Sequence, residues 1–233
     1  MTLHYPTVLF DLDGTLTDPR EGITRSIQYA LGKLGIDEPD ITTLEHFIGP
    51  PLLQAFMQFY GFDEAKAWEA VNFYRERFKV IGLYENRVFD GVMPLLEALN
   101  SQGRQLYVAT SKPWEFAREI ARHFDFAKHF KVIYGSELDG TRTNKVELIA
   151  HLMREERLDP ATTLMIGDRK HDLIGARSNG LDSAAVGYGF GSFEELNAEA
   201  PTWHFETLAQ MHQAFMQRRS EERRVGKECP RCV

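Results

Sequence analysis

Short apolar runs recur along the chain, and each ends at a polar or turn residue. They occupy positions 8–10, 106–109, 132–134, 164–166 and 184–186. Apolar runs of this length, bounded by turn residues, are typical of strands that are buried on both faces. Helical spacing of apolar residues predicts helices between them, at 92–101, 114–124, 145–155 and 172–179. Strands that alternate with helices predict an α/β fold with a parallel sheet and right-handed crossovers.

One long interval interrupts this alternation. Between about residues 18 and 86 the pattern is helical only, with expected helices at 20–34, 51–60 and 63–81. A helical block between the first and second strands predicts an insert that forms its own subdomain. We therefore expect a core of residues 1–17 and 87–217 and a helical insert of residues 18–86.

The C-terminal residues 218–233 break from the periodic pattern. They contain both cysteines of the chain, Cys229 and Cys232, in the sequence CPRC. This is the spacing of half a zinc knuckle, but a second pair of ligands is missing. We interpret the segment as a disordered tail or an artificial extension, with a metal site as the alternative.

Composition narrows the class of protein. The 233 residues are 43% hydrophobic and 26% charged, which is ordinary for a globular protein, and the formal net charge is -7. The first 215 residues contain no stripe of Lys and Arg, so we expect no nucleic-acid partner. No apolar segment approaches the roughly 18 residues of a membrane span, and no secretory signal begins the chain. We expect a cytoplasmic monomer or weak homodimer.

Residues with chemical function collect where the expected strands end. The strands are followed by Asp11, Thr110, Gly167-Asp168 and Gly187. In an open parallel sheet, ligands bind at the carboxyl ends of the strands. The sequence therefore predicts a site at this edge.

The first of these segments, DLDGTLTD, contains a pair of carboxylates. Asp11 and Asp13 can both face one cavity if the chain leaves the strand after Asp11, and Gly14 provides the backbone freedom for that turn. Two neighbouring carboxylates need a cation or a shared proton. The alternative is an Asx-turn that ends the strand.

The segment IGDRKHD contributes two more carboxylates. Asp168 follows a strand and Asp172 lies at the start of the next helix. Oxygen ligands from two strand ends suit a hard cation such as Mg²⁺. Alternatively, Asp172 only caps the helix.

Two further positions are candidates for phosphate binding. Thr110 and Ser111 end a strand just before a helix, where a hydroxyl and free amides form a natural phosphate site. An ordinary helix cap by Ser111 is the alternative. Lys145 opposes the dipole at the start of its helix, which suggests another role, although a solvated lysine is the more common case.

These four segments, taken together, resemble the motifs of the haloacid dehalogenase superfamily. DLDGT resembles its first motif, Thr110 its second, Lys145 its third and GDRKHD its fourth, in the order and spacing of the family over about residues 5 to 215. Ser111 is a departure, because relatives often have Asn there. The resemblance implies a Rossmann-like core with a helical cap inserted after the first strand.

The resemblance also implies residue roles. Asp11 would attack phosphorus and Asp13 would act as acid and base. Mg²⁺ would be held by Asp11, by the backbone carbonyl of Asp13 and by Asp168, with Asp172 a direct or indirect ligand. Thr110, Ser111 and Lys145 would bind the phosphoryl group of a small phosphate monoester.

Comparison within the superfamily favours a phosphatase. Dehalogenases lack the second Asp, and hexose-phosphate mutases usually have a His where this chain has Ile23. The loop FIGPPL, with Gly49 and Pro50, matches the cap loop that faces the substrate, although a plain helix-helix turn is equally compatible. TLTDPREGI and VATSKP are most similar to 5′-nucleotidase-like members and next to phosphoglycolate phosphatases. We therefore expect a nucleoside 5′-monophosphate as substrate and 2-phosphoglycolate as the alternative.

Other classes of function remain as alternatives. A phosphorylated receiver domain also uses an Asp, a Thr or Ser, a Lys and Mg²⁺, but has no inserted cap. A non-catalytic phosphate-binding module is a further possibility. The loop 187–191, GYGFG, superficially resembles a dinucleotide loop, but it follows the last expected strand and lacks the third glycine. We interpret it as a connecting loop.

Overall fold

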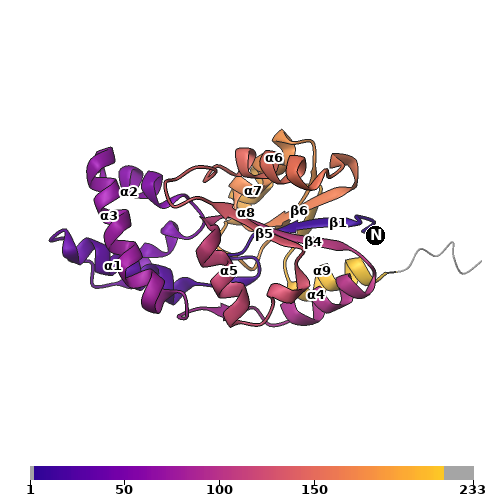
Figure 1. Ribbon diagram of the computed structural model, residues 1–233, viewed down its shortest axis with the longest axis horizontal. Coiled ribbons are helices and arrows are strands. Elements are labelled where there is room, and N and C mark those ends of the chain that lie inside the picture. Colours follow the sequence, from indigo (N-terminus) through magenta and orange to yellow (C-terminus); the bar gives the residue numbers. More distant parts are fainter. Residues whose placement is uncertain (1–2, 218–233) are drawn as a thin grey trace, which may run out of the picture.

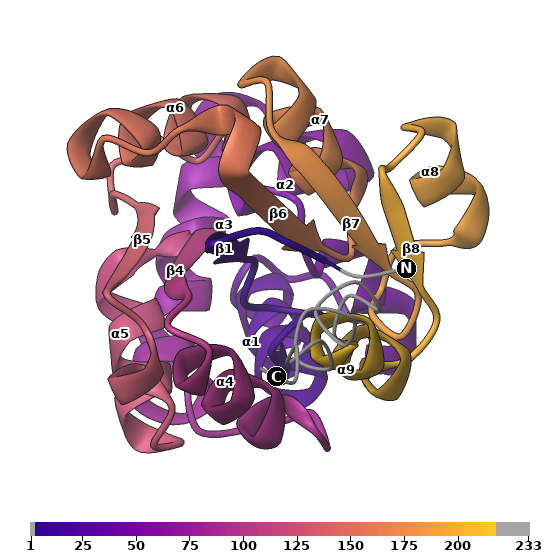
Figure 2. The same cartoon turned by 90° about the vertical axis from the view of Figure 1, so that its right-hand side faces the viewer.

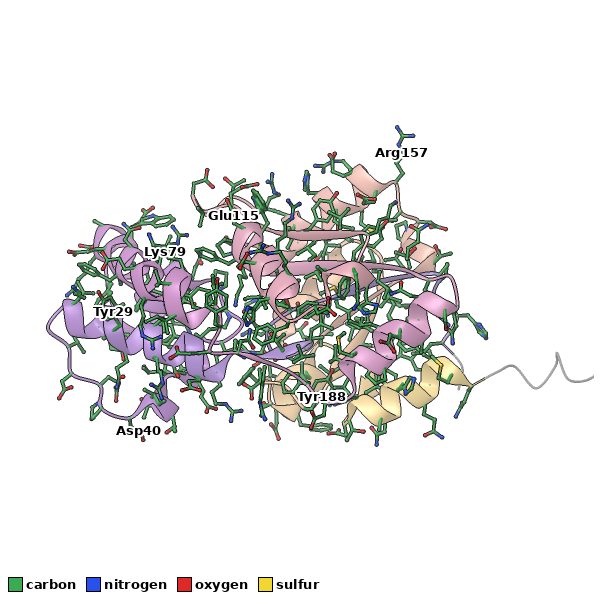
Figure 3. All side chains as sticks on the ribbon, turned by 60° about the horizontal axis from the view of Figure 1, so that its bottom comes forward. Tyr29, Asp40, Lys79, Glu115, Arg157 and Tyr188 are labelled. Atoms are coloured by element: carbon green, nitrogen blue, oxygen red, sulfur yellow. The ribbon has the colours of Figure 1, made fainter. Side chains whose placement is uncertain are left out.

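The computed structural model describes residues 3–217, so the predicted tail lies outside the described residues. A sheet flanked by helices forms one end of the molecule, and the helices that follow the first strand form the other (Figure 1). Among labelled side chains, those of Tyr29, Asp40 and Lys79 lie on the helical end, whereas Arg157 projects from the opposite end (Figure 3).

The sheet has the predicted α/β form. Within residues 3–217 it contains six parallel strands in the order β5-β4-β1-β6-β7-β8. Their bounds are β1 Thr7–Phe10, β4 Gln105–Pro113, β5 Val132–Ser136, β6 Thr163–Gly167, β7 Asp182–Val186 and β8 Trp203–Phe205. The first five correspond to the predicted apolar runs. The short edge strand β8 was not predicted.

Alternating side chains of the strands serve two separate hydrophobic layers. Leu9 and Met165 face one layer, and Phe10 and Ile166 face the other. The first layer is covered by α6 Lys145–Glu156 and α7 Lys170–Ser178. The second is covered by α4 Val92–Ser101, α5 Trp114–His123 and α9 Leu208–Met216 (Figure 2). Burial on both faces explains why these strands are continuous apolar runs. A further helix, α8 Phe193–Ala198, packs beside α7 through Leu173 and Leu196.

The helical insertion is attached through a short two-stranded ribbon. β2 Thr17–Asp18 pairs antiparallel with β3 Arg87–Val88, and an ion pair of 2.8 Å joins Asp18 to Arg87. Between them lie α1 Arg20–Lys33, a 3₁₀ helix Ile41–Phe47, α2 Leu52–Tyr60, α3 Glu64–Arg77 and a π-helical turn Phe78–Gly82. The insertion follows β1, as predicted, and we call it the cap. The domain boundaries at residues 17 and 87 stay a prediction.

Two local expectations need correction. Strand β4 continues to Pro113, which itself precedes α5 without a side-chain cap, so Ser111 does not cap that helix. Helix α7 begins at Lys170, two residues before the predicted start, and this places Asp172 in its first turn. In the described part of the chain, no helix combines the length and the apolar character needed to span a membrane.

Candidate active site

Asp11 and Asp13 lie on the turn that leaves the central strand β1. The amide of Asp11 still donates to Ile166 O (2.9 Å), so Asp11 remains registered against β6. Gly14 follows with a φ of +84°, and a Cβ on it would lie 2.1 Å from Asp168 Oδ2. Only glycine therefore allows the turn to approach Asp168 this closely. Both aspartates are buried and line the same cavity.

Three carboxylates, one following β1 and two following β6, meet beside this turn. Asp11, Asp168 and Asp172 each offer an oxygen within 4.8 Å of the others, and all three are buried. Burial raises the pKa of Asp168 well above its ordinary value, and the charges of Asp11 and Asp172 add to that increase. Burial likewise raises the pKa of Asp172 to about 6. The cluster is therefore short of positive charge.

Lys145 supplies part of that positive charge. Its Nζ lies 2.8 Å from Asp11 Oδ1 and 2.5 Å from Asp172 Oδ1, and it donates to Ala109 O (2.7 Å). Although burial alone would lower the pKa of Lys145, the charges of Asp11 and Asp172 raise it. One ammonium beside three carboxylates leaves an excess of negative charge, and oxygen donors of this kind fit a divalent cation.

Asp172 both caps its helix and contacts Lys145. Its Oδ2 accepts from the backbone N–H of Arg169 (3.1 Å), which caps α7. Its Oδ1 is the atom that contacts Lys145. Capping therefore holds the carboxylate at the site, and the two interpretations are compatible. The side chain of Asp13 is not part of this acidic cluster; the prediction of a metal contact concerned its backbone carbonyl.

The glycine-rich loop 187–191 encloses Asp168. Phe190 N donates to Asp168 Oδ2 (2.8 Å), and Thr15 Oγ1 donates to Oδ1 (3.2 Å). A Cβ on Gly189 would lie 2.3 Å from the Asp168 side chain, and one on Gly191 would lie 2.1 Å from its carbonyl. Close packing around Asp168 therefore explains Gly189 and Gly191.

Strand β4 brings Thr110, Ser111 and Lys112 to the same edge. All three line the cavity, and Thr110 is fully enclosed. Lys112, which the sequence analysis did not single out, is buried, and its Nζ lies 2.8 and 2.7 Å from the two carboxylate oxygens of Asp13. Burial raises the pKa of Asp13, and Lys112 opposes that increase. The sequence did offer one signal for Lys112, its spacing of two residues from Thr110. Residues two apart on a strand share a face, so the two side chains are expected on the same side of β4.

The cavity itself lies between the core and the cap and has a volume of about 280 Å³. Gly49 and Pro50 line it, as predicted for the cap loop. Aromatic side chains form much of the remaining wall, and these are Phe47, Trp68, Tyr74, Phe78 and Phe116. Further acidic residues, Glu64, Glu137 and Asp139, also line it.

Two arginines connect the cap to the core, and one of them, Arg75, lines this cavity. Arg169 of the core donates to Ile48 O in the cap loop and also binds Glu195 (2.9 Å). Arg75 of the cap donates to Leu138 O (2.7 Å) in the loop between β5 and α6. The sequence analysis missed both, because a backbone acceptor on another element leaves no residue pattern.

Comparisons with known proteins agree with this geometry. Residues 8–186 match the model of the haloacid dehalogenase-like hydrolase family. A 5′-nucleotidase of Pseudomonas aeruginosa is 70% identical over 213 residues, which cover 91% of this chain and 96% of the relative. The tyrosine-protein kinase PtkA of Mycobacterium tuberculosis is 39% identical over 210 residues, covering 89% of this chain and 72% of that protein.

Solved structures give the same result. One is the crystal structure of a protein from Clostridium acetobutylicum that is described as a predicted phosphatase. It superposes with a TM-score of 0.88 at 45% sequence identity, and the match covers 91% of this chain and 98% of that one. The family match, the curated relatives and the shared architecture lead to one conclusion: the chain belongs to the haloacid dehalogenase-like hydrolase family.

Proposed function

We propose that this protein is a Mg²⁺-dependent phosphatase that hydrolyses nucleoside 5′-monophosphates through an aspartyl-phosphate on Asp11. The observation that carries the proposal is the meeting of Asp11, Asp168 and Asp172 beside Lys145, with Asp11 also lining the cavity between core and cap. Asp11, Asp168 and Asp172 would hold the metal, together with the backbone carbonyl of Asp13. A divalent cation at such a site offsets the repulsion between a carboxylate nucleophile and a phosphate.

In the first half of the reaction, an Asp11 oxygen forms a bond to phosphorus as the bond to the leaving oxygen breaks. Asp13, in its protonated form, gives its proton to that leaving oxygen and the alcohol departs. Lys145 contacts Asp11 and stabilises charge on the phosphoryl oxygens. Thr110 and Ser111, which line the cavity, provide further hydrogen bonds to those oxygens.

In the second half, a water oxygen bonds to phosphorus and the bond to Asp11 breaks. Asp13, now a carboxylate, takes the proton of the water. Inorganic phosphate leaves, and both aspartates return to their starting forms. The cap assists both halves because it excludes bulk water from the cavity.

The cavity wall favours a nucleoside over a glycolate as the leaving group. Beyond the two catalytic aspartates it presents the carboxylates of Glu64, Glu137 and Asp139, with Arg75 and Lys112 as cations. A leaving group with its own carboxylate would meet this negative excess, whereas a nucleoside is uncharged and offers a flat ring to the aromatic wall. The 70% identical relative bears the name 5′-nucleotidase, which supports the same choice.

Other reactions fit the site less well. Ile23 lines the cavity at the position where mutases usually have a His, and it offers no group for proton transfer. A receiver domain would lack the cap. Steady hydrolysis of p-nitrophenyl phosphate separates a phosphatase from a receiver or a binding module, neither of which turns over this ester.

The deciding experiment is a Mg²⁺-dependent panel of phosphate monoesters. It measures kcat/KM for nucleoside 5′-monophosphates, 2-phosphoglycolate and hexose phosphates. We expect the highest values with nucleotides. A far higher value with 2-phosphoglycolate than with every nucleotide would assign the alternative activity. The monomeric or weakly dimeric state and the cytoplasmic location stay predictions.

A further inference from the structure

Lys112 forms a two-point contact with the proposed acid and base of the reaction. Its Nζ lies 2.8 Å from Asp13 Oδ1 and 2.7 Å from Asp13 Oδ2, and both side chains are at most 11% exposed. An ammonium that contacts both oxygens of a carboxylate restricts its rotation about the bond to Cβ. The position of the Asp13 carboxylate therefore depends on Lys112.

The backbone of Lys112 is itself held in place. Its N–H donates to Thr110 Oγ1 (3.3 Å), and the pairing of β4 with β5 shifts register between Ala109 and Pro113. On β5, a Cβ at Gly135 would lie 2.4 Å from Lys112 O. Any side chain at position 135 would displace Lys112. Because Gly135 has none, β5 can lie this close to the Lys112 backbone.

The cap encloses the contact from the other side. Lys112 Nζ lies 4.8 Å from the ring centre of Phe78, which belongs to the π-helical turn and is 1% exposed. An aromatic face attracts an ammonium and keeps water away from it. With water excluded, the attraction between Lys112 and Asp13 is stronger than it would be at the surface.

The other charged and titratable groups around Asp13 do not duplicate this contact. These groups are Asp11 just after β1, Lys145 in α6 and Tyr74 in α3. Lys145 is directed to Asp11 and Asp172 instead of Asp13. Within residues 3–217, Lys112 is the cation that forms an ion pair with Asp13.

We propose that Lys112 is the positioning residue of the acid and base: it holds the Asp13 carboxyl group at the leaving oxygen without exchanging a proton itself. The inference rests on the proposed phosphatase reaction. In that reaction Asp13 passes its proton to the leaving oxygen while the phosphorus–oxygen bond breaks and the bond to Asp11 forms. A misplaced Asp13 slows this step most when the leaving oxygen is a poor leaving group.

The test compares two leaving groups in the same enzyme preparation. Lys112→Met removes the charge and keeps most of the stem. We measure kcat/KM, which reports steps up to the first irreversible one, for a nucleoside 5′-monophosphate and for p-nitrophenyl phosphate. The alkyl oxygen of a nucleotide needs protonation, whereas p-nitrophenolate leaves readily without it. The ratio of the two values does not depend on the fraction of protein that is folded.

We expect Lys112→Met to lower kcat/KM for the nucleotide by roughly 10- to 100-fold, a range typical of residues that orient a catalytic group. The value for p-nitrophenyl phosphate should fall far less. Lys112→Arg, which keeps the charge, should recover most of the loss. Lys128→Met, which removes an exposed lysine paired with Asp125, is the matched control and should leave both values unchanged.

A double mutant shows whether Lys112 acts through Asp13. In an Asp13→Asn background, Lys112→Met should add little further loss, because the group that it positions has already been changed. Independent, additive losses would overturn the proposal. So would equal losses for both substrates with a raised KM, since these would make Lys112 a phosphate-binding residue. An unchanged ratio of the two kcat/KM values would also overturn it.

The wild-type values separate this inference from the proposed function. Hydrolysis of 2-phosphoglycolate but of no nucleotide would reject the proposed substrate. The Lys112 comparison would then use 2-phosphoglycolate, whose leaving oxygen is also an alkyl oxygen. A wild-type enzyme that hydrolyses none of these esters with Mg²⁺ would reject the phosphatase reaction and, with it, the role of Lys112.

Discussion

At the scale of single residues, Asp11 and Asp13 have different cationic partners. Lys145 contacts Asp11, and Lys112 contacts Asp13. These contacts separate the nucleophile from the proposed acid and base, although the two aspartates are only two positions apart in the sequence. Because each aspartate has its own lysine partner, the two neighbouring carboxylates can take different roles.

Asp11→Asn tests the assignment of the nucleophile. An amide has no carboxylate oxygen with which to attack phosphorus, so we expect no phospho-enzyme and no measurable turnover. Acid quenching after incubation with a ³²P-labelled substrate measures the covalent phosphate. Acid-stable retention of label in this variant at the wild-type level would place the nucleophile elsewhere.

At the scale of elements, strand ends and helix ends meet around fixed contacts. Asp172 caps α7 and contacts Lys145 at the start of α6, which ties two helices to the site. Farther from the site, Glu156 at the end of α6 accepts from Tyr107 (3.1 Å) and Tyr134 (3.0 Å) and pairs with Lys131 (3.0 Å). The helix that carries Lys145 is thus joined to the sheet at both of its ends.

The pH dependence of stability in Glu156→Gln tests the contacts at the C-terminal end of α6. Burial alone would raise the pKa of Glu156, but Lys131 and the two tyrosine hydroxyls lower it overall. Because the pKa of Glu156 is lower in the folded state than in the unfolded state, its ionic contacts stabilise the protein fully above the unfolded-state pKa. This stabilisation is lost as the pH falls through the folded-state pKa. At pH 7 we expect the variant to lose about 1 kcal/mol of stability. Urea unfolding of both proteins should show this difference shrinking towards pH 3, and a difference independent of pH would contradict it.

At the scale of the whole molecule, the cap and the core enclose the cavity jointly. Arg169 reaches Ile48 in the cap loop, and Arg75 reaches Leu138 in the core. The acidic cluster lies on the core side of this boundary. A cation bound there would stabilise the native state, because the unfolded chain does not bring the three aspartates together.

Mg²⁺ should therefore raise the melting temperature of the protein. We expect a rise of a few degrees at millimolar Mg²⁺, in line with about 2 to 3 kcal/mol for a ligand at 100 times its Kd. EDTA should reverse the rise. Asp168→Asn should abolish it, whereas the surface variant Lys128→Met should retain it; an equal rise in Asp168→Asn would place the ion at another site.

Much of the site was predictable because its main residues follow strand ends. Asp11 and Thr110 come directly after apolar runs and Asp168 one residue after another, and parallel strands deliver their carboxyl ends to one edge. Lys145 was found through the family motif and through its unfavourable position at a helix start. Lys112 was not found, because its spacing from Thr110 indicates a shared face but not that its charge is buried against Asp13.

The sequence by itself determined the α/β alternation, the place of the helical insertion and the set of acidic residues, because hydrophobic periodicity and turn residues are local properties. Only the tertiary structure decided which cation partners which carboxylate, how Gly14 and Gly189 allow close packing around Asp168, and where Arg75 and Arg169 connect cap to core. These contacts join residues distant in the chain, and their partners are chosen by folding. The edge strand β8 belongs with them, as three residues at a sheet edge make too short an apolar pattern to recognise.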